Sequence, residues 1–359
     1  FYIYFFSSFT GGLTGAVVSD LGSPAGGLDI FTAPVLSALV LNTSNVSLNH
    51  TDVNLTAYNS SNTAIRVIYN WLRNDTPIAL LNMPFEGINV TTTDNAWDYS
   101  GFGNNGTEVG AFWNSSGGYD GAGAYKFVNN PTASRQFINI SDDDSLDIGT
   151  NDFTIMAWIK ANATLDAGAL SSMEFISKRD GNNKGYLLSI RVASANRRVL
   201  GFLLGDGIGI ASGSADSATD LVDDKWHHVA VTFDRDASAT YYVDGLPDGS
   251  PPTKSISALQ GKSVANTVNL FIGIVNPAAT VEGNNFNGTL DEVMIFNRSL
   301  SPYEIRMIFR NHSNSIFSNH TELWDNWTVI GYPNNGTGDG APVRSNTVRI
   351  REITIPQIT

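Results

Sequence analysis

Short runs in which apolar and polar residues alternate recur along the whole chain, and they constrain its fold more than any other feature. The first three are "PVLSALVLN", "DVNLTAYNS" and "AIRVIYNWLRND", at 34–42, 52–60 and 64–75. Turn-forming Asn, Ser and Asp separate them. Alternation with a period of two puts one set of side chains on one face of a strand, so the pattern predicts antiparallel β-sheets.

Length and composition narrow the class further. A chain of 359 residues is longer than one typical domain, so we expect two domains of unequal size. Its net charge of −13 argues against a nucleic-acid partner. The chain contains no Cys, whereas secreted animal domains usually carry disulfides. Together with the export signals below, this favours a prokaryotic surface, and an archaeal one in particular.

The two ends of the chain are expected to form one sandwich. Three or four strands before residue 83 leave a sandwich incomplete. The C-terminal stretch supplies a strand with Trp327 and Val329, a turn-rich loop, and a last strand from Ser345 to about Ile353. Trp71 on the third strand resembles the core Trp of immunoglobulin-like domains, although the disulfide that usually accompanies it is absent.

The block between these halves carries several motifs in a fixed order. They are "NAWDYSGFGNNGTEVGAFWNSSGGYDGAGAYKFV", "DFTIMAWIKA", "KWHHVAVTFDRDASATYYVDG", "NLFIG" and "FNGTLDEVMIFNRSLSPYEI". In this order they resemble the laminin-G/concanavalin A-like superfamily, which implies a jelly-roll sandwich. "YVDGLPDG" also predicts a hairpin turning at Asp244 and Gly245. "SPYEIRMIF" predicts a short helix with Ser301, Pro302 and Glu304 at its capped start.

The acidic and imidazole side chains do not predict catalysis. A retaining glycosidase needs two carboxyl groups on one face, about 5 to 5.5 Å apart. Asp291 and Glu292 are adjacent in a strand, so we expect them on opposite faces. The same argument separates His227 from His228 as a metal pair. We therefore expect a protein that is not an enzyme.

Calcium is the one metal cofactor that the sequence supports. "WDYSGFGNNG" offers Asp98, Asn104 and Asn105 in one compact loop, and Ca²⁺ prefers mixed oxygen ligands of this kind. The resemblance implies that such a calcium joins this loop to an acidic residue of the last strand, here Asp291. The alternative is that these side chains satisfy only the backbone of a turn.

N-glycosylation sequons are the strongest signal in the composition. There are 17, whereas random placement of the same residues would give roughly six. They are Asn42, Asn45, Asn49, Asn54, Asn59, Asn74, Asn89, Asn105, Asn114, Asn139, Asn162, Asn287, Asn297, Asn311, Asn319, Asn326 and Asn335. Residues 1–41 and 165–286 contain none, which marks either candidate contact surfaces or chance clustering. We expect N-linked glycans as covalent cofactors.

The aromatic side chains of the inserted block leave two roles open. Trp113, Tyr119 and Trp158 could serve as platforms for a sugar ligand, because the resemblance to the superfamily also implies sugar binding. Large aromatics in sandwiches more often lie in the core.

The N-terminal segment is aromatic and β-branched and suits an extended strand better than a helix. Its assembly residues are Phe1, Tyr2, Ile3, Tyr4, Phe5 and Phe6. Polar and Gly residues break the apolar run too early for a membrane span. The missing initiator Met suggests that a signal peptide has been removed. Such a strand either adds to a sheet of a neighbouring copy, pairs within its own chain, or is a remnant of a leader.

These observations predict an all-β chain in four parts. Residues 1–33 form a donor strand and linker, 34–83 and 313–359 the halves of an immunoglobulin-like sandwich, and 84–312 a concanavalin A-like sandwich inserted between them. The expected function is a structural subunit of an extracellular glycosylated filament or surface layer, whose partners are copies of itself. The alternatives are a carbohydrate-binding adhesin and, less favoured, a glycosidase.

Overall fold

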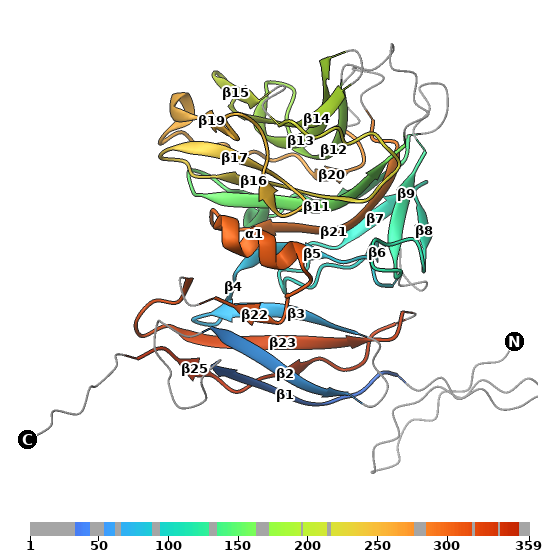
Figure 1. The fold of residues 1–359 in the computed structure, drawn as a ribbon, viewed down its shortest axis with the longest axis vertical. Coiled ribbons are helices and arrows are strands. Elements are labelled where there is room, and N and C mark those ends of the chain that lie inside the picture. The colour runs from blue at the N-terminus through green and yellow to red at the C-terminus, as the bar shows by residue number, and fades with distance from the viewer. Residues whose placement is uncertain are drawn as a thin grey trace, which may run out of the picture.

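Two β-sandwiches stack on one another (Figure 1), which confirms the all-β prediction. This computed structural model describes residues 33–43, 54–61, 66–87, 94–128, 135–162, 172–194, 197–213, 217–275, 285–317, 320–336 and 338–351. The predicted strand from Phe1 to Phe6 lies outside them. No helix within these ranges is long and apolar enough to cross a membrane.

The smaller sandwich is built from both ends of the described chain. One sheet has the order β1-β2-β22, and the other has the order β24-β23-β3-β4 with β25 beside β23. The strands are β1 (Leu36–Thr43), β2 (Leu55–Ser61), β3 (Arg66–Arg73), β4 (Thr76–Pro77), β22 (Ser315–Ile316), β23 (Asn326–Asn334), β24 (Val343–Arg344) and β25 (Val348–Arg349). β25 is much shorter than the predicted last strand, which was to begin at Ser345. Residues beyond 351 lie outside the description.

The described chain enters the smaller sandwich at one end and leaves it at the other. In Figure 1 the dark blue start of β1 lies at the right of this sandwich, and the red end of the chain after β25 lies at its left. The larger sandwich projects to one side of this line.

The larger sandwich consists of an eight-stranded and a nine-stranded sheet. The first has the order β15-β14-β13-β12-β20-β10-β7-β6, with β6 (Asp94–Ala96), β7 (Gly106–Val109), β10 (Phe137–Ile140), β12 (Ser172–Arg179), β13 (Lys184–Ser194), β14 (Arg197–Asp206), β15 (Ile210–Gly213) and β20 (Leu270–Ile272). The second has the order β18-β17-β16-β11-β21-β9-β8, with β19 beside β17 and β5 beside β21. Its strands are β5 (Ala79–Met83), β8 (Phe112–Asn114), β9 (Ala124–Phe127), β11 (Phe153–Ala161), β16 (His227–Phe233), β17 (Ser238–Val243), β18 (Leu246–Pro247), β19 (Thr253–Ser255) and β21 (Gly288–Phe296).

Alternation along β11 shows how the sequence builds this sandwich. Phe153, Ile155 and Ile159 point into the core between the two sheets. Met156, on the opposite face, packs with the helix and the smaller sandwich instead. Both faces of β11 are therefore buried, which explains why its sequence is apolar on one face and partly apolar on the other.

A continuous apolar cluster joins the two sandwiches. Met156, Tyr242 and Phe296 on the outer face of the nine-stranded sheet pack in one cluster with Ile305 of α1 (Pro302–Phe309) and with Trp71 of β3. β5 pairs with β21, so the larger sandwich begins at residue 79, earlier than the expected residue 84. The two sandwiches therefore form one packed body.

Two local predictions are confirmed in detail. Asp244 and Gly245 both have positive φ, 50° and 75°, as a tight hairpin turn requires. The Ser301 side chain accepts a hydrogen bond from the Glu304 backbone, and the Glu304 side chain accepts one from the Ser301 backbone. Such an N-cap contributes about 1 kcal/mol.

Candidate functional site

Strand β21 changes its neighbour halfway along its length. Up to Leu290 it pairs with β9, and from Val293 onwards it pairs with β5. Asp291 and Glu292 lie where the partner changes, so neither strand covers them on that edge. Loops that follow β5 and β8 approach this gap.

A β-bulge lies at this point, where two acidic residues are adjacent in the strand. Asp291 lies opposite Trp158 on β11, whereas Met294 lies opposite Met156, so β21 holds one extra residue. Glu292 has a φ of 48°. We expected Asp291 and Glu292 on opposite faces from regular alternation, and the bulge interrupts this alternation at the two residues. Their charges now interact directly.

Three carboxyl groups meet at the gap. One oxygen each of Glu86, Asp120 and Glu292 lies within 4.8 Å of the others. Glu86 follows β5, and Asp120 lies in the Gly-rich turn between β8 and β9. These residues line a pocket of about 280 Å³ at the junction of the sandwiches, which we call the acidic pocket.

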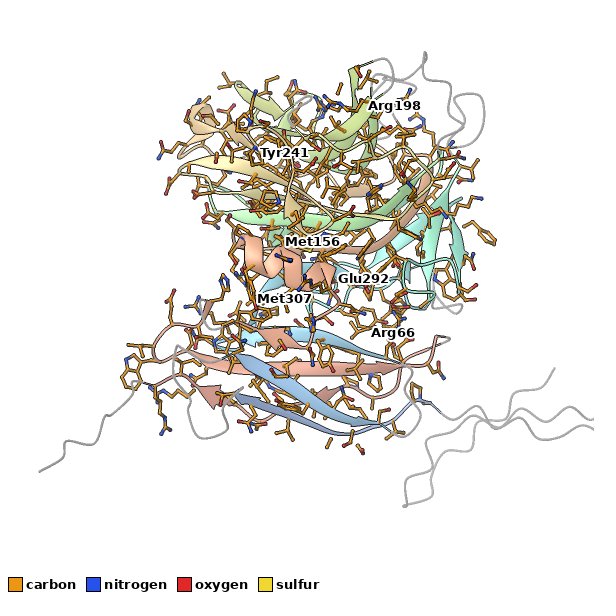
Figure 2. All side chains as sticks on the ribbon, in the orientation of Figure 1. Arg66, Met156, Arg198, Tyr241, Glu292 and Met307 are labelled. Carbon is orange, nitrogen blue, oxygen red and sulfur yellow. The ribbon has the colours of Figure 1, made fainter. Side chains whose placement is uncertain are left out.

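An arginine of the smaller sandwich reaches into the acidic pocket. Figure 2 shows Glu292 above the junction and Arg66, the first residue of β3, below it. The Arg66 guanidinium lies 2.6 Å from an Asp120 carboxylate oxygen and also contacts the Glu86 carboxylate. The Arg66 guanidinium is therefore the shared counter-charge of Glu86 and Asp120.

The pKa values of Glu292 and Asp291 reflect the excess of carboxyl groups over the single guanidinium. Burial, followed by the charge of Asp120, raises the pKa of Glu292 to about 8, against the opposing charge of Arg66. Burial, together with the charges of Glu292 and Asp120, raises the pKa of Asp291 well above its ordinary value. If all its acids are ionised, the acidic pocket carries more negative charge than Arg66 neutralises, so a proton or a further cation is favoured there.

Backbone contacts hold Asp291 behind the pocket. Its carboxylate accepts hydrogen bonds from the amides of Tyr119 and Glu292, at 3.1 and 2.9 Å. A Cβ on Gly118 would come within 2.6 Å of the same carboxylate, so only glycine lets the turn approach this closely. Asp291 therefore fixes the turn that carries Asp120.

One buried amide oxygen beside the pocket lacks a partner. Asn82 on β5 is 2% exposed and lines the same pocket. Its Nδ2 donates to the Tyr69 carbonyl at 3.3 Å, whereas its Oδ1 has no hydrogen-bond partner. Three carboxylates and an amide oxygen are the ligands that Ca²⁺ prefers, so the residues present fit this ion.

The predicted calcium loop is organised differently. The Asp98 carboxylate accepts hydrogen bonds from the amides of Asn82, Ser100 and Asn104 and from the Ser100 hydroxyl. The Asn105 side-chain oxygen accepts one from the Asp98 amide. Asp98 and Asn105 thus bond backbone amides, and the Asn104 side chain donates to the Leu80 carbonyl and the Ser145 hydroxyl. Calcium binding at these residues stays a prediction, and Asp291 lies behind the acidic pocket.

Glu86 and Asp120 were not singled out from the sequence. Each is a lone acid in a loop, and their partner Arg66 is 20 residues from one and 54 from the other in sequence. The only sequence signal was the Gly-rich stretch "GGYDGAG", because a close backbone approach needs glycine.

The aromatic candidates are structural. Trp158 is 9% exposed and stacks on Tyr119 with ring centroids 4.0 Å apart. The Trp113 indole donates to the Phe85 carbonyl at 2.8 Å. His228 is buried beside Trp158, and its burial lowers its pKa to about 4. Trp113 and Tyr119 are half-buried, whereas Trp158 and His228 are buried.

A polar strip lies on the outer face of the eight-stranded sheet. Glu174 on β12 is directly opposite Ser189 on β13, and the Arg191 Nε donates to the Ser189 hydroxyl at 2.9 Å. Glu174 Oε2 and the Ser177 hydroxyl are buried without partners among the described residues. Burial raises the pKa of Glu174. This strip falls within the sequon-free stretch 165–286.

The sequon asparagines separate cleanly from the buried ones. Thirteen sequons lie in the described ranges, and none of their asparagines is buried. They are Asn42, Asn54, Asn59, Asn74, Asn105, Asn114, Asn139, Asn162, Asn287, Asn297, Asn311, Asn326 and Asn335. The four buried asparagines of these ranges, none of them in a sequon, are Asn70, Asn82, Asn104 and Asn334. Asn45, Asn49, Asn89 and Asn319 lie outside the description.

Residues 132–306 match the family model described as the concanavalin A-like lectin/glucanases superfamily. This segment is similar to that superfamily. The match covers most of the larger sandwich, from β10 to β21, so this sandwich is the concanavalin A-like domain. The immunoglobulin-like character of the smaller sandwich stays a prediction. No curated protein gives a significant match to the chain.

Solved structures share the fold at low identity. The binding domain of Paraclostridial Mosquitocidal Protein 1 matches with a TM-score of 0.50 and 20% identity, covering 65% of this chain and 52% of that one. A structure of botulinum neurotoxin type C, whose cell entry is dependent upon interaction with two ganglioside molecules, matches with a TM-score of 0.48 and 18% identity over 67% and 52% of the two chains. The chain thus spans about half the length of these structures.

Proposed function

We propose that the chain is a structural subunit of an extracellular, glycosylated filament or cell-surface layer. The observation that carries the proposal is the path of the chain through the smaller sandwich, which it enters at one end and leaves at the other (Figure 1). Units joined at these ends would lie in line, with the concanavalin A-like domain projecting sideways. Such head-to-tail contacts do not close and therefore build open assemblies.

The proposed contact is donor-strand addition by Phe1 to Phe6 of a neighbouring copy. An acceptor needs a sheet edge with unpaired backbone groups. β22 pairs only with Leu55 and Thr56 of β2, so the rest of this edge has no strand partner among the described strands. Asn59 lies on this open stretch of β2.

Deleting residues 1–20 tests the proposal, with size-exclusion chromatography and negative-stain microscopy as the readout. We expect the full chain to assemble and the truncated chain to remain a folded monomer. Assembly that persists after truncation would overturn donor-strand addition.

A matched pair of variants tests the acceptor edge. N59P removes an amide from the edge, whereas N59Q keeps the amide and removes the same sequon. We expect N59P alone to block assembly. Equal assembly of both variants contradicts the assignment of this edge.

The proposal includes glycans on exposed sequons and Ca²⁺ in the acidic pocket. It is supported by the thirteen described sequon asparagines, none of which is buried, and by the excess of acidic groups around Arg66. The proposal includes no catalysis, because Arg66 contacts both Glu86 and Asp120 where a substrate would need to reach them.

Carbohydrate binding is the second candidate, and the polar strip favours it. Glu174, Ser177 and Arg191 place polar atoms on the outer face of this sheet, within the sequon-free stretch 165–286. A glycan array with the full chain, followed by the variants E174Q and R191A, tests this role. Binding that survives in both variants would place any sugar site elsewhere.

A further inference from the structure

Three strongly exposed aromatic side chains each precede a sequon by two or three residues. Phe112 is 65% exposed and precedes Asn114, Trp324 is 55% exposed and precedes Asn326, and Phe102 is 38% exposed and precedes Asn105. Exposed aromatic rings are costly to hydrate, and soluble proteins usually cover them. Their shared position ahead of a sequon needs a physical reason.

The geometry is most direct at Phe112. Phe112 and Asn114 are the first and last residues of β8, and both are exposed. Residues two apart in a strand point to the same face, so the ring and the amide lie side by side. The Asn114 Oδ1 accepts a hydrogen bond from the Ser116 amide at 3.1 Å, which orients the side-chain amide.

The turn before β23 presents Trp324 rigidly. Trp324 has a φ of 75°, a strained backbone for a bulky residue. Its amide donates to the Ile350 carbonyl at 3.0 Å. The following residue, Asp325, is buried, and its carboxylate forms an ion pair with the Arg73 guanidinium at 2.8 Å. This anchoring holds the indole in solvent, with Arg349 5.3 Å from its centroid.

The third pair, Phe102 and Asn105, lies in a loop. Gly103 follows Phe102 with a φ of 79°, and the Asn105 amide donates to the Gly103 carbonyl at 2.8 Å. The Asn105 Oδ1 accepts from the Asp98 amide, so the amide nitrogen that would carry a sugar is not the atom in that bond.

We propose that Phe112, Trp324 and Phe102 are intramolecular platforms for the first sugar of the glycans on Asn114, Asn326 and Asn105. One face of a hexose ring is lined by C–H groups and is apolar enough to pack on an aromatic ring. A sugar tethered two or three residues away meets the ring at a high effective concentration. This contact buries both surfaces and orders the first residue of the glycan. The inference rests on the glycosylation in the proposed function.

A double-mutant cycle on Phe112 and Asn114 tests the inference. The full chain, F112A, N114Q and the double variant are made in a host that performs N-glycosylation, and peptide mass spectrometry gives the occupancy of Asn114. We expect N114Q to lower the melting temperature by roughly 2 °C in the wild-type background and by much less in F112A. F112W should restore the dependence on the glycan.

Two results would overturn the inference, and they are distinguishable. If Asn114 is occupied and N114Q has the same effect with and without Phe112, the platform is wrong while glycosylation stands. If Asn114 carries no glycan, glycosylation at this site fails as well. Y303A is the control, because Tyr303 is 51% exposed and no sequon follows it within three residues. Its effect should not depend on N114Q.

Discussion

The guanidinium of Arg66 and the carboxylate of Asp120 lie 2.6 Å apart across the junction of the two sandwiches. Arg66 opens β3 of the smaller sandwich, and Asp120 lies in a turn of the concanavalin A-like domain. An ion pair between them links two domains that also share an apolar cluster. Its surroundings contain more acid than Arg66 can balance, and the first two predictions follow from that imbalance.

Calcium should stabilise the protein through the acidic pocket. We expect millimolar Ca²⁺ to raise the melting temperature by several degrees, because the ion binds the folded state and neutralises Glu292 and its neighbours. E292Q should lose most of this response. E322Q, which alters an exposed acid outside the pocket, is the control. An unchanged response in E292Q would contradict the assignment.

Removing the arginine should have opposite effects on stability and on calcium affinity. We expect R66Q, in the presence of a chelator, to be less stable by about 1–3 kcal/mol, because Glu86 and Asp120 lose their counter-charge. Its affinity for Ca²⁺ in calorimetry should rise, since no guanidinium competes with the ion. R66K keeps the charge and should resemble the wild type. A fall in Ca²⁺ affinity in R66Q would exclude competition at this pocket.

Acid should weaken the anchorage of α1. Burial alone would raise the pKa of Glu304, but hydrogen bonds and charges from His320 and Arg298 lower it to about 2, from 4.5. The stabilisation is complete above pH 4.5 and is lost as the pH falls toward 2, on the order of 3 kcal/mol. Urea titrations between pH 5 and 2 measure it. In E304Q this part of the pH dependence should disappear, and an unchanged profile would contradict the prediction.

The two sandwiches should unfold as one unit. Met156 is 1% exposed in the shared apolar cluster (Figure 2), so M156E buries a charge at the junction. We expect a single calorimetric transition in the wild type and two transitions in M156E, the first several degrees lower. V40E, at an exposed site on β1, should keep one transition. Two transitions in the wild type would show that the cluster does not couple the domains.

Local sequence signals were sufficient where a residue acts through its chain neighbours. The alternation in β11 and the capping box at Ser301 depend on residues within one element, so both could be predicted. The order of the motifs was enough to identify the concanavalin A-like domain.

The acidic pocket could not be predicted in the same way. It needs a bulge at Glu292, which no rule of alternation anticipates. It also needs Arg66, Glu86 and Asp120 to meet from three elements. The role of Asp98 is ambiguous from the sequence for a related reason, because an acid in an Asn-rich turn looks like a ligand whether it binds an ion or its own backbone.

The positions at which the chain enters and leaves the smaller sandwich also determine how the molecule bears load. Tension applied to the two ends would run lengthwise through that sandwich, parallel to its strands. The concanavalin A-like domain would lie outside the path of the force. Ladder hydrogen bonds, which lie across the strands, are then sheared together instead of being peeled apart one at a time. A row of such units would resist stretching and still leave each side domain unstrained and accessible.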